Sequence, residues 1–235
     1  MPTSRARRRE DVTARVLEIG RRHLAEHGAA GLSLRAVTRD LGMVSSAVYR
    51  YVANRDELLT LLLVDAYTDQ ADAVDAAVAA RSGDPWDDRL LVAAHAFRAW
   101  AVAEPSRYAL LYGSPVPGYA APPEVTIEPG TRVIGSLLHL VGEGVAGGDV
   151  PDRPAPDDPP EPLAGELRVV GSEVGLPTHP AVLSRALLLW ATVVGATSLE
   201  VFGQYGADTF AKPAQAYDAQ VRMALAVLRG GLDHP

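Results

Sequence analysis

Residues 33–59 read SLRAVTRDLGMVSSAVYRYVANRDELL, and this stretch decides the fold. Ser33 suits a helix N-cap, because its hydroxyl can accept hydrogen bonds from amides that the first turn leaves unpaired. Leu34, Val37 and Leu41 then follow at i, i+3 and i+7, which places one apolar stripe on a short helix. The stretch therefore opens with a capped helix of about two turns.

A tight turn and a second short helix follow. Gly42 stands where a left-handed C-cap residue costs least. Ser45 and Ser46 can cap a helix from Ala47 to Val52, whose polar face carries both serines, Arg50 and two tyrosines. Two short helices around a glycine-bearing turn are typical of the helix-turn-helix, whose second helix fits the DNA major groove.

A third helix restarts at residues 54–57. Asn54 is its expected cap, and Asp56 and Glu57 suit the positive end of the helix dipole. Arg55 opposes that dipole, which is understandable if a phosphate binds beside it.

The stretch resembles the DNA-binding domain of the TetR/AcrR family of bacterial transcriptional regulators. That pattern has Thr or Ser opening the second helix, Ile-Ala-x-x-Ala-Gly-Val, a Tyr seven residues after the Gly, a further aromatic residue, and Lys before Leu-Leu. The matching positions are Ser33, Val37-Thr38, Leu41-Gly42-Met43, Tyr49, Tyr51, Arg55 and Leu58-Leu59, without a gap. The chain departs from the pattern at Thr38 (usually Ala), Val44 (usually the capping Ser) and Val52 (usually Phe).

The charge is divided unevenly along the 235 residues. Residues 1–55 hold 11 Lys+Arg and 5 Asp+Glu, a net +6, and residues 56–235 hold 11 and 24, a net −13, which together give −7. A basic nucleic-acid-binding module on an acidic body shows this asymmetry, although a charged face can also serve solubility alone. We expect a DNA-binding domain over 1–55 and a larger domain over 56–235.

Composition excludes several classes of protein. There is no cysteine, so disulfides and thiolate metal sites are excluded. His23 and His27 are four residues apart but have no third ligand nearby, so no metal site is expected. No uninterrupted apolar stretch reaches the roughly 20 residues of a membrane span. We expect a cytoplasmic protein with no membrane partner and no cofactor.

The pattern predicts an all-α fold of nine to ten helices. Residues 1–9 are an arginine-containing arm that could follow phosphates or be a disordered tail, and a first helix runs from Glu10 to His27 and ends at Gly28. Further helices are expected over 54–81, 86–104, 106–112, 128–146, 163–174, 183–202 and 214–228. The six prolines and five acidic residues of 147–162 favour a mobile loop that buries no core.

The two C-terminal helices predict a homodimer. Residues 183–202 are hydrophobic on almost every side, and Gly195, Ala196 and Ser198 would let a second helix approach closely. Spare apolar surface on both helices favours a symmetric four-helix interface, which the family resemblance also implies. The spacing of Trp190, Gly195 and Glu200 resembles the WHG-type subgroup of the family, with Val194 where that pattern has His.

The resemblance implies a bipartite site for double-stranded DNA. Two recognition helices about one DNA turn apart would bind a palindromic operator. Arg50 could pair with guanine through two hydrogen bonds, and Tyr49 would pack between helices while its hydroxyl contacts a phosphate. The residues expected at DNA are Ser33, Arg35, Ser45, Ser46, Ala47, Tyr49, Arg50, Tyr51 and Arg55.

The larger domain carries no His-Glu-x-x-His, no Gly-x-Ser-x-Gly and no dinucleotide glycine pattern. It is not expected to be an enzyme. Aromatic and histidine residues on apolar helices favour a cavity for a largely apolar small-molecule effector, although core packing also accounts for each of them. These residues are His95, Trp100, Tyr108, Tyr112, His139 and Trp190.

The resemblance thus implies a repressor that a small molecule releases from its operator. Two alternatives stay open at this point. The chain could be an effector-independent regulator or an activator, or it could be a helical interaction protein that does not bind DNA.

Overall fold

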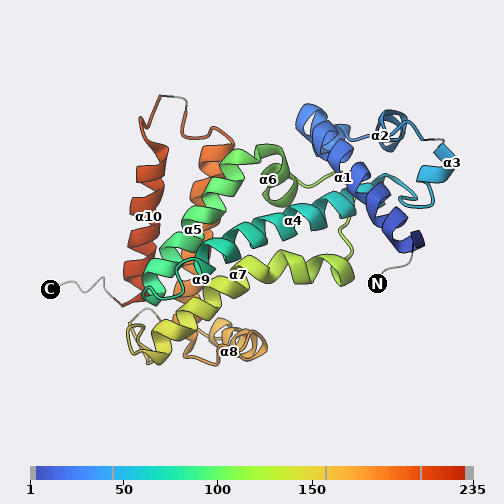
Figure 1. Ribbon diagram of the computed structural model, residues 1–235. Coiled ribbons are helices and arrows are strands. Elements are labelled where there is room, and N and C mark those ends of the chain that lie inside the picture. Colours follow the sequence, from blue (N-terminus) through green and yellow to red (C-terminus); the bar gives the residue numbers. More distant parts are fainter. Residues whose placement is uncertain (1–3, 44, 157, 207, 231–235) are drawn as a thin grey trace. The chain divides into compact units, whose positions relative to one another are not determined.

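The computed structural model describes residues 4–43, 45–156, 158–206 and 208–230, with the backbone alone at 4–6, 45 and 46. The described residues form helices and no strand (Figure 1), so the predicted all-α class is confirmed. The helices are α1 (Ser4–Gly31), α2 (Leu34–Asp40), α3 (Ser45–Val48), α4 (Arg55–Ala79), α5 (Trp86–Ala103), α6 (Pro105–Tyr112), α7 (Pro123–Ala146), α8 (Leu163–Glu173), α9 (Pro180–Val201) and α10 (Pro213–Leu228).

The chain forms two compact units, and α4 and α7 each contribute residues to both. The first unit comprises the residues up to 69 together with Glu104–Gly130. Its core is built from α1, α2, α3 and the first half of α4, with Val16, Val37, Val48 and Leu58 fully buried. At Gly20, an added Cβ would lie 3.1 Å from Leu62, so α1 and α4 are in close contact there.

The second unit comprises Gln70–Ala103 and the residues from 131 on. Helix α9 packs on α10, α5 and α8, and its inner face buries Leu189 and Val193 completely. Phe97 of α5 and Val221 of α10 fill the same interior. The predicted domain boundary at residue 55 stays a prediction.

The start of the chain differs from the expected arm. Helix α1 already begins at Ser4, so Arg7, Arg8 and Arg9 lie on its first turns, while residues 1–3 are outside the described residues. Arginine and alanine are good helix formers, and neither proline nor glycine lies between Ser4 and Gly20, so the helix starts earlier than predicted. The prediction of a flexible arm over residues 1–9 was therefore wrong for residues 4–9.

Gly28 interrupts α1 at the residue that the sequence indicated. Its φ of +66° is a left-handed conformation, which glycine adopts without strain, and the helical geometry breaks there. The helix proper therefore runs to His27, as predicted.

The caps of α2 and α4 follow the predicted chemistry. The Ser33 hydroxyl accepts a hydrogen bond from the Ala36 amide at 3.4 Å, and Asn54 Oδ1 accepts one from the Glu57 amide at 2.9 Å. Glu57 also accepts a hydrogen bond from the amide of Ala53 at 2.6 Å. Each of these helices is thus held at its start by its own side chains.

Three further helix boundaries differ from their predictions by three residues or more. Helix α3 ends at Val48 rather than Val52, because the Tyr51 amide bonds to the Val48 carbonyl at 2.8 Å and closes a turn there. Helix α7 begins at Pro123, five residues early, and continues through Pro129. Helix α9 begins at Pro180, where a proline suits the first turn.

The proline-rich segment 147–162 contributes to the core, contrary to its composition. Val150 is only 1% exposed. The segment is also held by polar contacts, since Asp149 accepts a hydrogen bond from Trp86 Nε1 at 2.9 Å and Asp152 accepts one from the His179 amide at 2.6 Å. The expectation that the segment buries no core was wrong at Val150, and Asp149 and Asp152 bind it to Trp86 and His179.

Helix α9 is long and apolar enough to cross a membrane by length and composition alone. Core helices of globular proteins pass the same test, and ten of its residues are buried against its own unit, which also weakens the case for a span.

Candidate DNA-binding interface

The start of α1, together with α3 and the turn that follows it, lines a hollow of about 340 Å³ in the first unit. Arg8 and Arg9 come from α1, and Arg50 and Tyr51 come from the turn after α3. Met43 and Ala47 complete its lining, and none of these described residues is acidic. Three cations gathered without a counter-charge repel one another, so the hollow is suited to an anion such as a DNA phosphate.

The structure brings three predicted DNA residues, Ala47, Arg50 and Tyr51, to this hollow. Arg50 is exposed, Tyr51 is half-buried, and the ring of Tyr49 is 44% exposed. Tyr49 therefore does not pack fully between helices, and its ring is available to a groove wall. The side chains of Ser45 and Ser46 are outside the described residues, so their expected base contacts stay predictions.

Ser33 and Arg35 lie away from that hollow's lining. Ser33 caps α2, and Arg35 is exposed on the first turn of that helix. A helix start carries unpaired amides and a partial positive charge, which suits the phosphate contact expected of Arg35.

Arg55 has a structural role that the sequence did not reveal. Its Nε donates to the Leu32 carbonyl at 3.0 Å, and its Nη2 donates to Ala29 and Ala30 at 2.9 and 3.1 Å. Arg55 thus caps the carbonyls where α1 ends, which accounts for a cation at the start of α4 without any phosphate. The phosphate contact of Arg55 stays a prediction.

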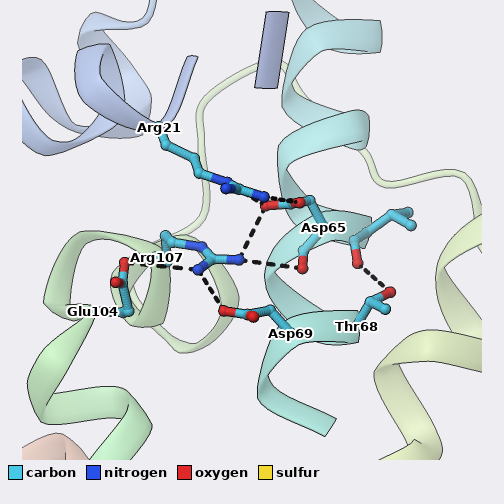
Figure 2. A network of polar contacts seen from close by, with 7 residues as sticks. Arg21, Asp65, Thr68, Asp69, Glu104 and Arg107 are labelled. Carbon is cyan, nitrogen blue, oxygen red and sulfur yellow. Dashed lines mark hydrogen bonds and ion pairs between the residues drawn. The ribbon is translucent and has the colours of Figure 1, made fainter. Parts of the chain in front are cut away.

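A charged network anchors α1 to α4 and α6 behind the helix-turn-helix (Figure 2). Arg21 Nε donates to Asp65 Oδ2 at 2.9 Å, and Arg107 donates to the same oxygen at 3.0 Å. Arg107 also donates to Asp69 Oδ2 at 2.6 Å and pairs with Glu104 at 3.7 Å. Only 8% of the Arg107 side chain is exposed, so the carboxylates compensate a buried charge.

A histidine pairs α1 with α2. His23 is buried, and its Nε2 donates to Asp40 Oδ2 at 2.8 Å, which lowers the pKa of Asp40 below its usual value. The histidine pair that sequence spacing presented as a conceivable metal site therefore has a packing explanation. His27 lies edge-on to His23, with ring centroids 5.7 Å apart.

The structure does not gather the six predicted effector residues at one cavity. Tyr108 and Tyr112 stack in the first unit with ring centroids 4.9 Å apart, and burial raises the pKa of Tyr112 far above its usual value. In the second unit, His95 Nε2 lies 2.8 Å from Asp218 Oδ1, and Trp190 packs edge-on against Phe97. Trp100 is buried in α5, while the His139 side chain is 79% exposed on α7.

Two hollows of the second unit lie beside α7. One, of about 340 Å³, lies among α7, α8 and α9; its described lining has no charged residue and none of those six. The other, of about 460 Å³, is lined by Arg89, Arg132, Asp75 and His139 together with apolar residues of α4 and α7. Sequence reasoning missed the first hollow because its valines and leucines resemble any helix core.

Taken together, a capped α2–turn–α3 module beside an arginine-lined hollow defines a helix-turn-helix DNA-binding protein. Residues 90–224 match the family model "Tetracyclin repressor-like, C-terminal domain", and the chain belongs to the TetR family of transcriptional regulators. It is a regulator and not an enzyme.

The similarity covers nearly the whole chain. It is 54% identical over 220 residues to the HTH-type transcriptional regulators Rv1816 of Mycobacterium tuberculosis and Mb1846 of Mycobacterium bovis, covering 94% of this chain and 93% of each relative. The crystal structure of SCO4313 matches with a TM-score of 0.76 and 33% identity, over 96% of this chain and 100% of that one. A TetR-family regulatory protein from Rhodococcus RHA1 shares the fold, with a TM-score of 0.60 and 16% identity over 92% and 96% of the two chains.

Proposed function

We propose that this protein is a homodimeric repressor that binds a palindromic DNA operator and is released from it by a small molecule. The observation that carries the proposal is the hollow lined by Arg8, Arg9 and Arg50 beside the α3 turn. Phosphates of the DNA backbone there would offset these clustered charges and set the position of α3 in the major groove.

In this proposal, Arg50 reads a base edge or a phosphate, while Tyr49 and Tyr51 contact the groove walls. Arg35 and the N-terminal cap of α2 contact the DNA backbone of the same operator half-site. Ser33, Ser45, Ser46, Ala47 and Arg55 complete the proposed DNA-binding set.

The dimer is proposed from α9 and α10. Helix α9 leaves Leu188, Leu199 and Phe202 exposed by 48%, 37% and 39%, and Met223 of α10 is 61% exposed. An added Cβ at Gly195 would contact nothing within 4 Å of its own chain, which leaves room for a partner helix. A symmetric pair of such surfaces forms a closed four-helix interface.

Release by an effector is proposed from the hollows beside α7. A ligand releases DNA only if it binds better to the conformation that cannot bind the operator, and a coupling of about 1–3 kcal/mol suffices for regulation. His95, Trp100, Tyr108, Tyr112, His139 and Trp190 stay candidate effector residues.

Operator selection from a random duplex pool, followed by fluorescence anisotropy, tests the DNA-binding part. Arg50→Ala is expected to weaken affinity by about tenfold or more, because each good bidentate contact contributes roughly 1–3 kcal/mol. Arg22→Ala is the matched control: it removes the same charge, but its position on α1 is roughly 20 Å from Arg9 at 1.5 Å per residue. Equal affinities of the two variants would refute the assigned interface.

Two further measurements test the dimer and the direction of regulation. Leu188→Asp is expected to yield monomers in analytical ultracentrifugation, whereas Val169→Asp, an exposed valine of α8, should leave the dimer intact. Transcription from an operator-bearing promoter should fall when the protein is added. A rise would identify an activator instead.

A further inference from the structure

The hollow among α7, α8 and α9 has a buried floor and a half-exposed rim. Leu167, Leu183 and Ala186 form part of the floor and are each at most 7% exposed. Val170, Val174 and Leu187 stand at the rim with exposures of 44%, 48% and 48%. An open apolar concavity of about 340 Å³ lies within the size range of small-molecule sites, roughly 300–1,000 Å³.

Gly135 of α7 lacks a structural reason within its own chain. A Cβ at Gly142 would lie 3.3 Å from Leu176, and one at Gly144 would lie 2.7 Å from Trp86, so close packing explains both glycines. At Gly135 an added Cβ would meet nothing within 4 Å. Glycine inside a helix is less favourable than alanine, so close approach of another molecule to the backbone is a physical reason for it.

We infer that this hollow binds a neutral, apolar small molecule that contacts the α7 backbone at Gly135. Thr131 is the polar side chain among the ten described lining residues, and none of the ten is charged. A charged ligand would lose its hydration there without a counter-charge, which disfavours an anion or a cation. That this ligand acts as the effector of a repressor rests on the proposed function. Its binding to the hollow does not require DNA.

A helix of a second copy is a poorer occupant of this hollow. A helix packs along a continuous stripe of side chains on its partner, whereas this hollow is bounded by residues of three different helices, α7, α8 and α9. The flat stripe of α9 through Leu188, Gly195 and Leu199 is better shaped for a helix. We therefore expect the hollow to bind a small molecule and the α9 stripe to bind a helix of a second copy.

The test uses the full chain and the neutral fluorophore N-phenyl-1-naphthylamine, whose emission rises in apolar surroundings. Saturable binding at one site per protomer is expected. Val170→Asp and Leu187→Asp should each weaken binding by about tenfold or more, because they place a carboxylate at the rim. The matched control is Val169→Asp, which alters a neighbouring exposed residue of α8 outside the hollow. Leu188→Asp, which alters the proposed dimer surface of α9, tests separately whether a second copy covers the hollow.

Competition identifies the ligand class. Decan-1-ol should displace the fluorophore, while decanoate at pH 8, which has the same chain length and a charge, should compete about tenfold more weakly or worse. Gly135→Ala should raise the melting temperature and lower probe affinity together, a combination that a purely structural glycine would not give.

The inference is overturned if the fluorophore does not bind, if the rim variants match the control, or if decanoate competes as well as decanol. It is also overturned if Leu188→Asp reduces probe affinity as much as Leu187→Asp, which would make the hollow part of a protomer interface. DNA affinity is measured separately on the same variants. Failure of the wild type to bind DNA would refute the proposed regulator and leave the probe result standing.

Discussion

Two hollows of about 340 Å³ occupy the two units of this protein and have opposite chemistry. The hollow of the first unit is lined by Arg8, Arg9 and Arg50, whereas the hollow among α7, α8 and α9 in the second unit has no charged residue in its described lining. Volume therefore does not choose the ligand. The charge of the lining residues determines which ligand each hollow can bind, because the cost of removing an ion from water is offset only where a residue of opposite charge lies beside it.

The two units also differ in how polar groups are compensated. The first unit shares one carboxylate, Asp65, between Arg21 and Arg107. The second unit contains pairs such as Arg98 with Glu200, where both side chains are 16% exposed. Its shared carboxylates are more exposed than Asp65, since Asp218 between His95 and Arg222 is 31% exposed and Asp65 is 13% exposed. A shared carboxylate makes α1, α4 and α6 depend on one residue.

The largest expected effect is that of Asp65→Ala. Removing this carboxylate leaves the buried guanidinium of Arg107 with fewer partners, and we expect the free energy of unfolding to fall by about 3 kcal/mol. Urea denaturation measures the loss. Glu161→Ala, which breaks the exposed pair with Arg168, should cost under about 0.5 kcal/mol. Similar losses in both variants would show that Asp65 is not the common anchor.

Two buried threonines, one in each unit, allow a second comparison, in which we expect the free energy of unfolding to change by about 1 kcal/mol. The Thr38 hydroxyl in α2 is buried without a hydrogen-bond partner, while Thr197 in α9 donates to the Val193 carbonyl at 2.8 Å. Thr38→Val should stabilise the protein by about 1 kcal/mol, and Thr197→Val should destabilise it by about as much. Thermal melts of both variants check this, and changes of the same sign would contradict it.

The smallest expected effect is a change in how the melting temperature depends on pH under acidic conditions. The hydrogen bond from His23 lowers the pKa of Asp40, and hydrogen bonds from Arg222 and then His95 lower that of Asp218. A lowered pKa adds stability above the carboxyl's unfolded value, near 3.9, and that stability is lost as the pH falls through the folded value. Asp40→Asn and Asp218→Asn should each flatten the dependence of melting temperature on pH between about 5 and 3.

At neutral pH each of these two variants should melt below the wild type, and the differences should shrink as the pH falls. An unchanged pH profile for Asp40→Asn would show that the His23 contact contributes nothing to folding.

Local chemistry made much of the fold predictable. Ser33, Asn54 and Gly28 mark their helix boundaries through caps and a left-handed residue, which are properties of a few adjacent residues. The end of α3 was not predictable in this way. It depends on the turn closed by Tyr51 onto Val48, which competes with one further helical turn of similar composition.

The site was predictable in part. The sequence placed Arg50 and Tyr51 on the recognition segment, but Arg8 and Arg9 were assigned to a flexible arm or a disordered tail. Their meeting with residue 50 is a tertiary contact across some forty residues, which local pattern does not encode. The apolar hollow was missed for the same reason: the packing of three successive helices forms it, and each lining residue has the character of a core residue.

Salt dependence of DNA binding tests the central claim most directly. In the triple variant Arg8→Ala, Arg9→Ala, Arg50→Ala, the slope of log affinity against log salt concentration should become shallower by about 0.9 for each phosphate that the protein no longer neutralises. Arg22→Ala should keep the wild-type slope. A triple variant with an unchanged slope and affinity would show that the arginine-lined hollow does not hold DNA.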